Sequence, residues 1–589
     1  LEISYIGYVT KSITAMAGKF DVTLEVDNQF IEESIVVGYG VQKKRDVTGA
    51  ISQVKSEDLQ ARTISNASQA LQGKTAGVQV LSSSARPGAS PTIRIRGISS
   101  NGSGDPLYVV DGRIATDISG IDPNDIQSME VLKDGASAAI YGAQAGNGVI
   151  LITTRKGSGD GKITYDYQLT SQSLAIIPKV MNAEQYADYY MEAGTFDIDR
   201  LYRYWDQKTN TDWARETFEN SLMQRHNLTF SAGNERSSLY TSISYLNNNG
   251  IVAGDADVYS RITGMLNASW KIKQWLEIGT NNQLEYYKAR SVAEGNEYGS
   301  LLLSVLQLDP LSPTHYAEED LPDYMRALMD KSIYGELLKD KDGRYYAIPA
   351  FGAAESSNPF IMRDNAYSMS RGFNINGSTY LNFTPVKGLM VTSRFGYRLS
   401  GGESYGYTND YYSNANAHQN FMSVNASTST PTYWQWENFA NYNHQFKGGH
   451  NFNAMAGMSF SESRSFGVSG SISGSDGEFC FKQDDPLFYY FAYATAGETK
   501  SVSGGEERFT RKYSWFGRLN YDFRGKYMLQ LSLRADAADS SVLPTSNRWG
   551  YFPAVSAGWT VTEEEFMSGA RNWLNNLKIR ASWCQNGST

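Results

Sequence analysis

The residue types that usually carry out catalysis or bind metals are present in this chain, but not at the spacings that such chemistry needs. The two cysteines, Cys480 and Cys584, are far apart and match no zinc or redox motif. The stretch "QGKT" at 72–75 ends like a phosphate-binding loop, yet Ser68 stands where that loop needs a glycine. The histidines form no HExxH-type ligand set; they are His226, His315, His418, His444 and His450. We therefore predict no catalytic residue, no metal site, no cofactor and no enzyme activity.

One short stretch favours a different chemistry, the pairing of backbone with a partner strand. Residues 31–40 read "IEESIVVGYG", in which Ile35, Val36 and Val37 favour extended backbone. Gly38 and Gly40 interrupt the run, so it is too short to build a sheet alone. The residues themselves leave two interpretations open: a strand that waits for a partner, or an ordinary linker strand between two domains.

Composition narrows the class of protein. The chain has 589 residues and a formal net charge of −9, so no overall positive field attracts nucleic acid, and the short run Lys43-Lys44-Arg45 is read as a solvated face. No stretch approaches 18 consecutive apolar residues, which excludes transmembrane helices but not the alternating strands of a transmembrane barrel. Aromatic residues make up 13% of the chain, which suits β-structure with exposed aromatics.

The connections between predicted strands alternate in length. Residues 41–157 mix short helices and strands, whereas about thirteen strands follow Gly161. The predicted turns are 233–237, 271–274, 385–388, 447–450 and 524–526, and the predicted loops are 247–258, 288–370, 401–431, 464–507 and 538–550. Only the connection 563–576 is longer than a turn should be. Short turns at one end and long loops at the other are typical of an outer-membrane barrel.

The strands themselves agree with a barrel. In 237–246, one face carries Leu239, Ile243 and Tyr245 and the other carries mostly serines. About ten residues at roughly 3.3 Å each, tilted by about 45°, cross an apolar band of about 25 Å. Alternation alone would also suit a soluble sandwich. The loop asymmetry favours the barrel, so we predict a mainly β protein.

Six motifs then occur in order at family-like spacing and resemble the plug domain of SusC-like (SusC/RagA-type) TonB-dependent outer-membrane transporters. They are "TGAISQV" (48–54), "ALQGKTAGVQV" (70–80), "TIRIRGISS" (92–100), "PLYVVDG" (106–112), "IDPNDIQSMEVLKDGASAAIYG" (121–142) and "NGVILITTRKG" (147–157). The resemblance implies a mixed α/β plug inside a transmembrane antiparallel barrel of about 22 strands, of which about thirteen are present here. It also implies an outer-membrane location, contact with outer-membrane lipid, and transport rather than catalysis.

The resemblance gives the opening stretch a role, because it lies where the family carries its TonB box. A TonB box adds a strand to the edge of the periplasmic domain of TonB. The TonB-binding residues implied in this way are Glu33, Ser34, Ile35, Val36, Val37, Gly38, Tyr39 and Gly40. The family further implies a SusD-like surface lipoprotein lid and an oligosaccharide or peptide substrate, and it allows a dimer of transporter–lid pairs.

The resemblance also points to residues within the plug. Charged plug residues are expected to contact the polar inner face of the barrel; these are Arg94, Arg96, Asp111 and Arg113. The flexible loop 97–106 is expected to face the substrate, which makes Asn101 and Asp105 candidate contacts, although a plain polar loop explains them equally well. One departure is Gln144, which stands where the family often has an arginine, so a salt bridge from that position to the barrel is not expected.

The resemblance divides the chain into four parts. Residues 1–30 resemble the end of a carboxypeptidase-regulatory-like β-sandwich, 31–42 form the TonB-box segment, 43–160 the plug, and 161–589 the N-terminal part of the barrel. Because about nine strands of the family barrel are missing, we expect the chain to be a fragment that does not form a working pore alone.

Three rival functions remain. A secreted hydrolase with β-domains would need paired carboxylates at a defined cleft, which the sequence does not locate. A TonB-dependent siderophore or cobalamin receptor without a lid would share the same fold, but the long loops 288–370 and 464–507 offer docking surface for a lid. A surface adhesin or glycan-binding β-protein would leave the plug and TonB-box motifs unexplained.

Overall fold

The fold is described from a computed structural model of the chain. The described residues are 2–3, 11–12, 34–43, 47–60, 64, 66–98, 104–177, 179–195, 197–292, 301–351, 356–474, 481, 485–495, 499–539, 544–570 and 573–587. The predicted sandwich of residues 1–30 lies outside them, apart from the paired strands β1 (Glu2–Ile3) and β2 (Lys11–Ser12).

The plug is a small α/β unit around a five-stranded sheet. The strand order is β5 (Ile51–Lys55), β10 (Ile126–Leu132), β11 (Val149–Thr154), β8 (Leu107–Val110) and β9 (Arg113–Ala115). β11 and β8 run parallel, and the other neighbours run antiparallel. A separate pair joins β6 (Val78–Leu81) to β7 (Thr92–Ile95). The helices are α1 (Ser56–Gln60), η2 (Ala67–Leu71), η3 (Pro123–Asp125), α2 (Gly135–Ala138) and η4 (Ala139–Ala145).

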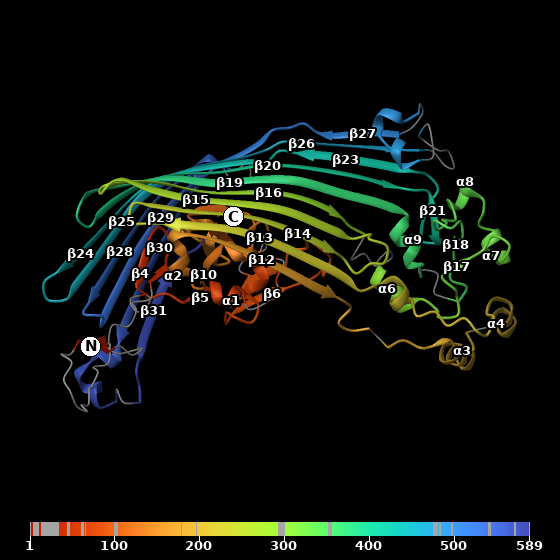
Figure 1. The fold of residues 1–589 in the computed structure, drawn as a ribbon, viewed down its shortest axis with the longest axis horizontal. Helices are drawn as coiled ribbons and strands as arrows, with labels where there is room; N and C mark the ends of the chain where they lie inside the picture. The colour runs from red at the N-terminus through yellow and green to blue at the C-terminus, as the bar shows by residue number, and fades with distance from the viewer. Residues whose placement is uncertain are drawn as a thin grey trace.

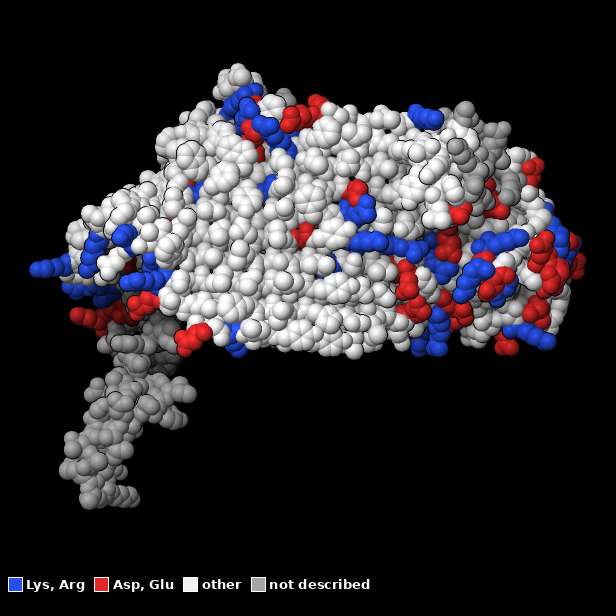
Figure 2. All heavy atoms as spheres, turned by 45° about the horizontal axis from the view of Figure 1, so that its top comes forward, with Lys and Arg blue, Asp and Glu red and all other residues white. Residues whose placement is uncertain are grey.

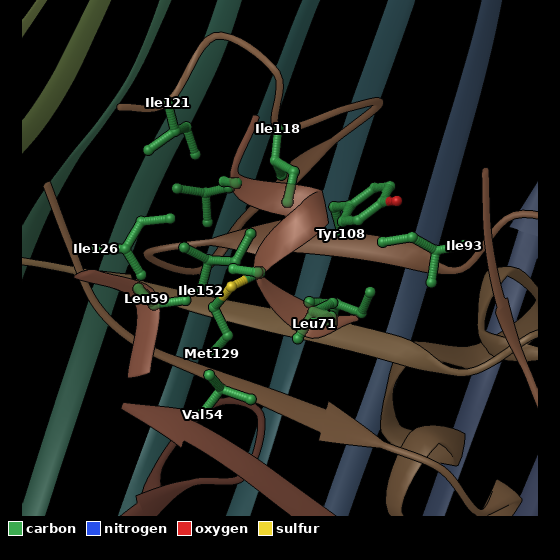
Figure 3. Close-up of a cluster of buried hydrophobic side chains, with 14 of the residues drawn as sticks. Val54, Leu59, Leu71, Ile93, Tyr108, Ile118, Ile121, Ile126, Met129 and Ile152 are labelled. Atoms are coloured by element: carbon green, nitrogen blue, oxygen red, sulfur yellow. The ribbon is translucent and has the colours of Figure 1, made fainter. Parts of the chain in front are cut away.

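The plug has its own apolar core. The sheet, α1 and η2 bury a cluster of aliphatic side chains that includes Leu59, Leu71, Ile126, Met129 and Ile152 (Figure 3). Each of these five side chains is at most 2% exposed. Burial of this kind stabilises a domain by roughly 25 cal/mol per Å² of apolar surface. Two side chains of the surrounding strands, Tyr240 and Met265, complete the cluster.

Long antiparallel strands form a wall that curves over the plug (Figure 1). The main path of this sheet runs through thirteen strands. They are β12 (Gly159–Gln172), β13 (Ser221–Gly233), β14 (Ser237–Asn249), β15 (Val258–Lys273), β16 (Leu276–Arg290), β19 (Ala366–Val386), β20 (Leu389–Thr408), β24 (Thr432–Phe446), β25 (His450–Ser465), β28 (Arg508–Phe523), β29 (Tyr527–Ala538), β30 (Trp549–Thr560) and β31 (Lys578–Cys584).

The outer face of the wall is apolar and the inner face is polar. On β29, Leu529, Leu531 and Leu533 are exposed, whereas Ser532 and Arg534 point inward and are buried. The space-filling view shows a broad central band nearly free of charge, with Lys, Arg, Asp and Glu gathered toward the two ends (Figure 2). This reverses the arrangement of a soluble sandwich, in which the apolar face is covered.

The long connections carry further structure at one end of the wall (Figure 1). The helices there are α3 (Ala183–Glu192), α4 (Ile198–Tyr204), α5 (Trp213–Thr217), α6 (Leu301–Gln307), α7 (Asp323–Arg326), α8 (Lys331–Tyr334), α9 (Pro359–Asp364), η5 (Pro486–Phe488), η6 (Phe491–Tyr493) and η7 (Thr545–Asn547). The strands there are β17 (His315–Tyr316), β18 (Tyr345–Tyr346), β21 (Tyr411–Asn414), β22 (Ala417–Gln419), β23 (Ser423–Ser429), β26 (Gly467–Ser473) and β27 (Thr499–Gly504).

The predicted fold class is confirmed, including the thirteen strands and the alternation of apolar and polar faces. Two details of the prediction were wrong. The strands reach 21 residues in β19, longer than the predicted ten or so. Parts of two predicted loops are strands of the sheet: the end of β20 and β23 within 401–431, and β26 and β27 within 464–507. The over-long connection 563–576 is explained by η8 (Val561–Glu563) and η9 (Glu565–Ala570).

No helix in the described ranges is both long and apolar enough to cross a membrane.

The plug core gives a direct test. Replacing Leu71 by alanine should lower the free energy of plug opening by about 2–5 kcal/mol, because the fully buried side chain would leave a cavity. Leu81→Ala is the matched control, since Leu81 also lies in the plug but is 53% exposed, and its effect should stay within about 0.5 kcal/mol. Hydrogen exchange of the β10 and β11 amides measures both values. Equal effects would contradict a self-supporting plug core.

Candidate functional site

The predicted TonB-box segment forms a β-hairpin just before the plug. β3 (Ser34–Val36) pairs antiparallel with β4 (Val41–Lys43), and the Val37 amide donates to the Gly40 carbonyl oxygen at 3.0 Å. Gly38 and Tyr39 form the two-residue turn with φ of 63° and 52°, as a type I′ turn requires. The left-handed φ of a tyrosine is unfavourable on its own, so contacts made by its side chain must offset it.

The Tyr39 side chain is inserted between the plug and the wall. Its hydroxyl donates to Glu437 Oε1 on β24 at 2.8 Å. Its ring stacks on Phe516 of β28 at a centroid distance of 4.4 Å and on Tyr141 of the plug at 5.6 Å, and it meets the edge of Phe439 at 5.3 Å. These contacts hold the turn in place.

The wall also binds the backbone of the hairpin. Arg518 Nη1 donates to the Val37 carbonyl at 2.6 Å and Nη2 to the Gly38 carbonyl at 3.1 Å, while Asn441 Nδ2 donates to the Tyr39 carbonyl at 3.1 Å. Ile35 and Val37 are buried together with Val47. In this conformation, carbonyls that a partner strand would use are already bonded. Glu33, the first residue of the predicted box, lies outside the described residues.

Two of the predicted plug–barrel residues lie next to the wall. Arg113 is 4% exposed, and its aliphatic stem lies against Gly396 of β20, where an added Cβ would come within 3.2 Å of Arg113 Cγ. Asp111 accepts hydrogen bonds from the Thr154 amide at 3.1 Å and hydroxyl at 2.6 Å, and Asn267 of β15 donates to the same hydroxyl at 2.7 Å. Asp111 therefore contacts the wall through Thr154.

The other predicted site residues lie elsewhere. Arg94 forms an ion pair with Asp105 at 2.7 Å. Both residues belong to the plug, so this ion pair does not join the plug to the wall. Arg96 is exposed, with a φ of 56°, and its amide donates to the Gly77 carbonyl. Asn101 lies outside the described residues.

A buried carboxylate pair, which the sequence did not single out, also joins plug and wall. Asp122 caps the start of the one-turn helix η3, and Asp125 is its last residue. Tyr240 Oη of β14 donates to Asp125 Oδ1 at 2.8 Å, and Ser244 Oγ donates to Asp122 Oδ2 at 2.6 Å. Burial, and then the neighbouring Asp122, raise the pKa of Asp125 to about 7. The "DPND" spacing was visible in the sequence, but nothing there showed that it faces a wall.

Across the part of the chain that the structure describes, no group of three or more histidine, cysteine, aspartate or glutamate residues could hold a metal ion.

Comparison with known proteins agrees with this architecture. Residues 43–149 match the TonB-dependent receptor plug domain. The chain is 31% identical to TonB-dependent receptor P39 of Formosa agariphila and 28% identical to TonB-dependent receptor SusC of Bacteroides thetaiotaomicron. The alignments cover 100% and 99% of this chain but 53% and 56% of those proteins, so the chain spans about half their length.

A solved structure, that of the RagAB peptide importer in its "open-open" state, has the same fold. It superposes with a TM-score of 0.75 at 24% identity, over 94% of this chain and 61% of that one. The chain is SusC-like. The predicted resemblance to SusC-like TonB-dependent transporters is thereby confirmed, and the hairpin of this SusC-like chain lies directly before its plug domain.

The Tyr39–Glu437 hydrogen bond can be tested by removing one hydroxyl. Tyr39→Phe removes one hydrogen-bond donor from the buried Glu437 carboxylate, which should weaken docking of the hairpin by about 1–3 kcal/mol. Hydrogen exchange of the amides of residues 34–43 should then be faster. Tyr527→Phe is the control, because Tyr527 donates to Glu564 at an exposed turn. Unchanged exchange in Tyr39→Phe would show that the hydroxyl does not hold the hairpin.

The carboxylate pair predicts a pH dependence. Because the pKa of Asp125 is raised in the docked plug from 3.8 to about 7, the docked state binds the extra proton; its contribution to stability is fully present below about pH 4 and is lost as pH rises through about 7. The urea midpoint of plug unfolding should fall across this range.

Asp125→Asn should remove most of that pH dependence. Asp117→Asn is the control, because Asp117 is exposed and, among the residues that the structure describes, is shown accepting hydrogen bonds from nearby Ser119. If the urea midpoint of Asp125→Asn still falls with pH as in the wild type, the pH dependence comes from other groups.

Proposed function

We propose that this chain forms the plug and part of the wall of a transporter that imports oligosaccharides or peptides across the outer membrane, driven by TonB. The observation that carries the proposal is the hairpin of residues 34–43, which lies directly before the plug and is docked through hydrogen bonds on the wall. A neutral hydrogen bond such as that of Asn441 contributes about 0.5–1.5 kcal/mol and one from a charged group such as Arg518 about 1.5–3 kcal/mol, so a pulling partner can exchange them for its own.

In this proposal, residues 33–40 are the TonB box and add a strand to the edge of TonB once the turn is withdrawn from the wall. Ile35, Val36 and Val37 are suited to the extended state, and strand addition depends on backbone hydrogen bonds more than on side chains. Withdrawal must extract Tyr39 from between Phe516 and Tyr141. The pull would then pass into the plug, which we assign to residues 43–160.

The outer membrane is the proposed location. The central band of the outer face is nearly free of charge and carries exposed leucines, isoleucines and aromatics (Figure 2). Such a band is stable only where lipid covers it. Charged side chains gather at its two ends, where headgroups and water would meet the protein.

The loop end of the wall is the proposed docking surface for a SusD-like lipoprotein lid. Its helices pack through an apolar core of their own, around Trp213, Met325 and Ile361, and so present a formed surface. The RagAB complex is described as a peptide importer, which supports peptides as one substrate class beside oligosaccharides. Arg113 and Asp111 are the proposed contacts at which plug and wall separate.

The test uses the full-length gene in its native host. Deleting Glu33–Gly40, or replacing it by a Gly/Ser linker of equal length, should abolish growth and uptake on one class of glycan or peptide while outer-membrane levels stay normal. Ile35→Val is the matched control, because it keeps a β-branched side chain and should retain uptake.

Unchanged uptake of every substrate that the intact gene supports would remove the TonB-box assignment. Loss of uptake for an iron chelate or cobalamin alone would instead indicate the lid-free receptor.

A further inference from the structure

A cavity of about 260 Å³ lies between the plug and the inner face of the wall. The wall contributes Arg398 from β20, Tyr433 from β24 and Lys512 from β28, and the plug contributes Thr116 and Gln144. A smaller space that shares Gln144, Tyr433 and Lys512 continues toward Tyr39 and Glu437.

The cavity is positively charged. None of its lining residues is acidic. Three acids lie nearby. Asp536 bonds to Arg534 at 2.6 Å, and Glu437 accepts from the Tyr39 hydroxyl, with Arg394 at 3.6 Å. Asp117 lines an adjoining cavity together with Arg398 but forms no ion pair with it. Within the described residues, the structure shows no ion pair for Arg398 or Lys512.

Arg398 is positioned by neutral groups. Its Nη1 donates to Thr116 Oγ1 at 2.8 Å, and its guanidinium lies over the Tyr433 ring at 5.7 Å. The remaining guanidinium donors have no carboxylate within ion-pair distance in the described part of the chain. Asp117 and Asp536 act on these two half-buried cations only from beyond ion-pair distance, so each cation keeps part of its desolvation cost, and a bound anion would offset it.

We propose that this cavity binds an anionic group, a carboxylate or a sulfate, on one residue of an oligosaccharide. Its volume is below the roughly 300–1,000 Å³ of a site for a whole drug-sized ligand, so it suits one residue of a longer chain. Hydroxyl and amide groups of Ser461, Ser463, Thr510 and Gln144 can bind sugar hydroxyls, and Tyr433 offers an aromatic face. The inference rests on the proposed function, since it names the substrate class of that importer.

A larger cavity shows that the charge of the lining, and not the volume, indicates a ligand class. About 770 Å³ lies near α3 and α6, but its lining includes Asp197 as well as Lys179 and Arg200. Arg200 there already donates to the Ala350 carbonyl at 2.6 Å. A lining with charges of both signs favours neither anionic nor cationic ligands. The lining of the cavity between Arg398 and Lys512 carries only positive charges and favours anions.

The test measures binding to the purified full-length protein by calorimetry at low ionic strength. The probes are tetragalacturonate for a carboxylate, a sulfated carrageenan tetrasaccharide for a sulfate, and maltotetraose as the neutral reference. At least one anionic probe should bind about tenfold or more tightly than maltotetraose, and Lys512→Gln and Arg398→Gln should each reduce that affinity about tenfold or more.

Two controls separate charge from structure. Arg398→Lys keeps the positive charge and should retain most of the affinity, and Lys447→Gln removes a cation at the distant turn between β24 and β25 and should change nothing. Rising salt should weaken binding of the anionic probes only.

The proposal would be overturned if no anionic probe binds the wild-type protein, if maltotetraose binds equally well, or if Lys512→Gln and Arg398→Gln leave affinity unchanged. These outcomes do not depend on TonB. If uptake requires residues 33–40 but Lys512→Gln leaves binding of the anionic probes unchanged, the import proposal stands and the anion-site proposal is wrong. If Lys512→Gln weakens binding but no TonB-dependent uptake is found, the anion-site proposal stands and the import proposal is wrong.

Discussion

The two-residue period of the strands is the constraint on which most of this structure depends. Successive side chains point to opposite faces, so a wall whose outer face is apolar at Leu529, Leu531 and Leu533 presents Ser532 and Arg534 inward. The plug therefore docks on a largely polar surface, to which it offers backbone carbonyls and carboxylates, and one apolar contact joins it to Phe439, Met455 and Phe516 of the wall. Arg534 donates to the Ile140 carbonyl at 2.8 Å, and Lys578 donates to that of Val47 at 2.8 Å.

This division separates what holds the plug together from what holds it in the wall. Leu71 and Ile126 are packed in a dry core that costs several kcal/mol to disturb. The contacts of Asp122 and Asp125 with the wall are hydrogen bonds that water or a partner could replace. A domain with such an interior and such an exterior can move as a unit. That property agrees with the proposed response to TonB.

The sequence predicted the elements better than the contacts. Alternation and loop length were enough for thirteen strands, because both follow from local chain geometry. Ile35, Val36 and Val37 were predicted to be extended, with Gly38 and Gly40 interrupting the run; the sequence did not show that residues 34–43 fold back into a hairpin, which they do because Gly38 and Tyr39 adopt left-handed φ. Arg518, Asn441 and Glu437 fix that turn from about 400 residues or more away in the sequence, and no local pattern could pair them with it. Asp105 was predicted to contact substrate and Arg94 to contact the barrel, yet the two residues form an ion pair with each other.

A single strand connects the cavity, the plug and the hairpin. The inward side chains of β24 follow one another at alternate positions. Tyr433 lines the cavity, and Gln435 accepts from the Ile114 amide of β9 at 3.0 Å. Glu437 accepts from the Tyr39 hydroxyl, Phe439 meets the Tyr39 ring, and Asn441 donates to the Tyr39 carbonyl. Hydrogen bonds to β20 and β25 on its two sides keep this row rigid. A group bound beside Tyr433 and the turn at Tyr39 therefore lie on the same face of one element, about four residues of strand or roughly 13 Å apart along β24.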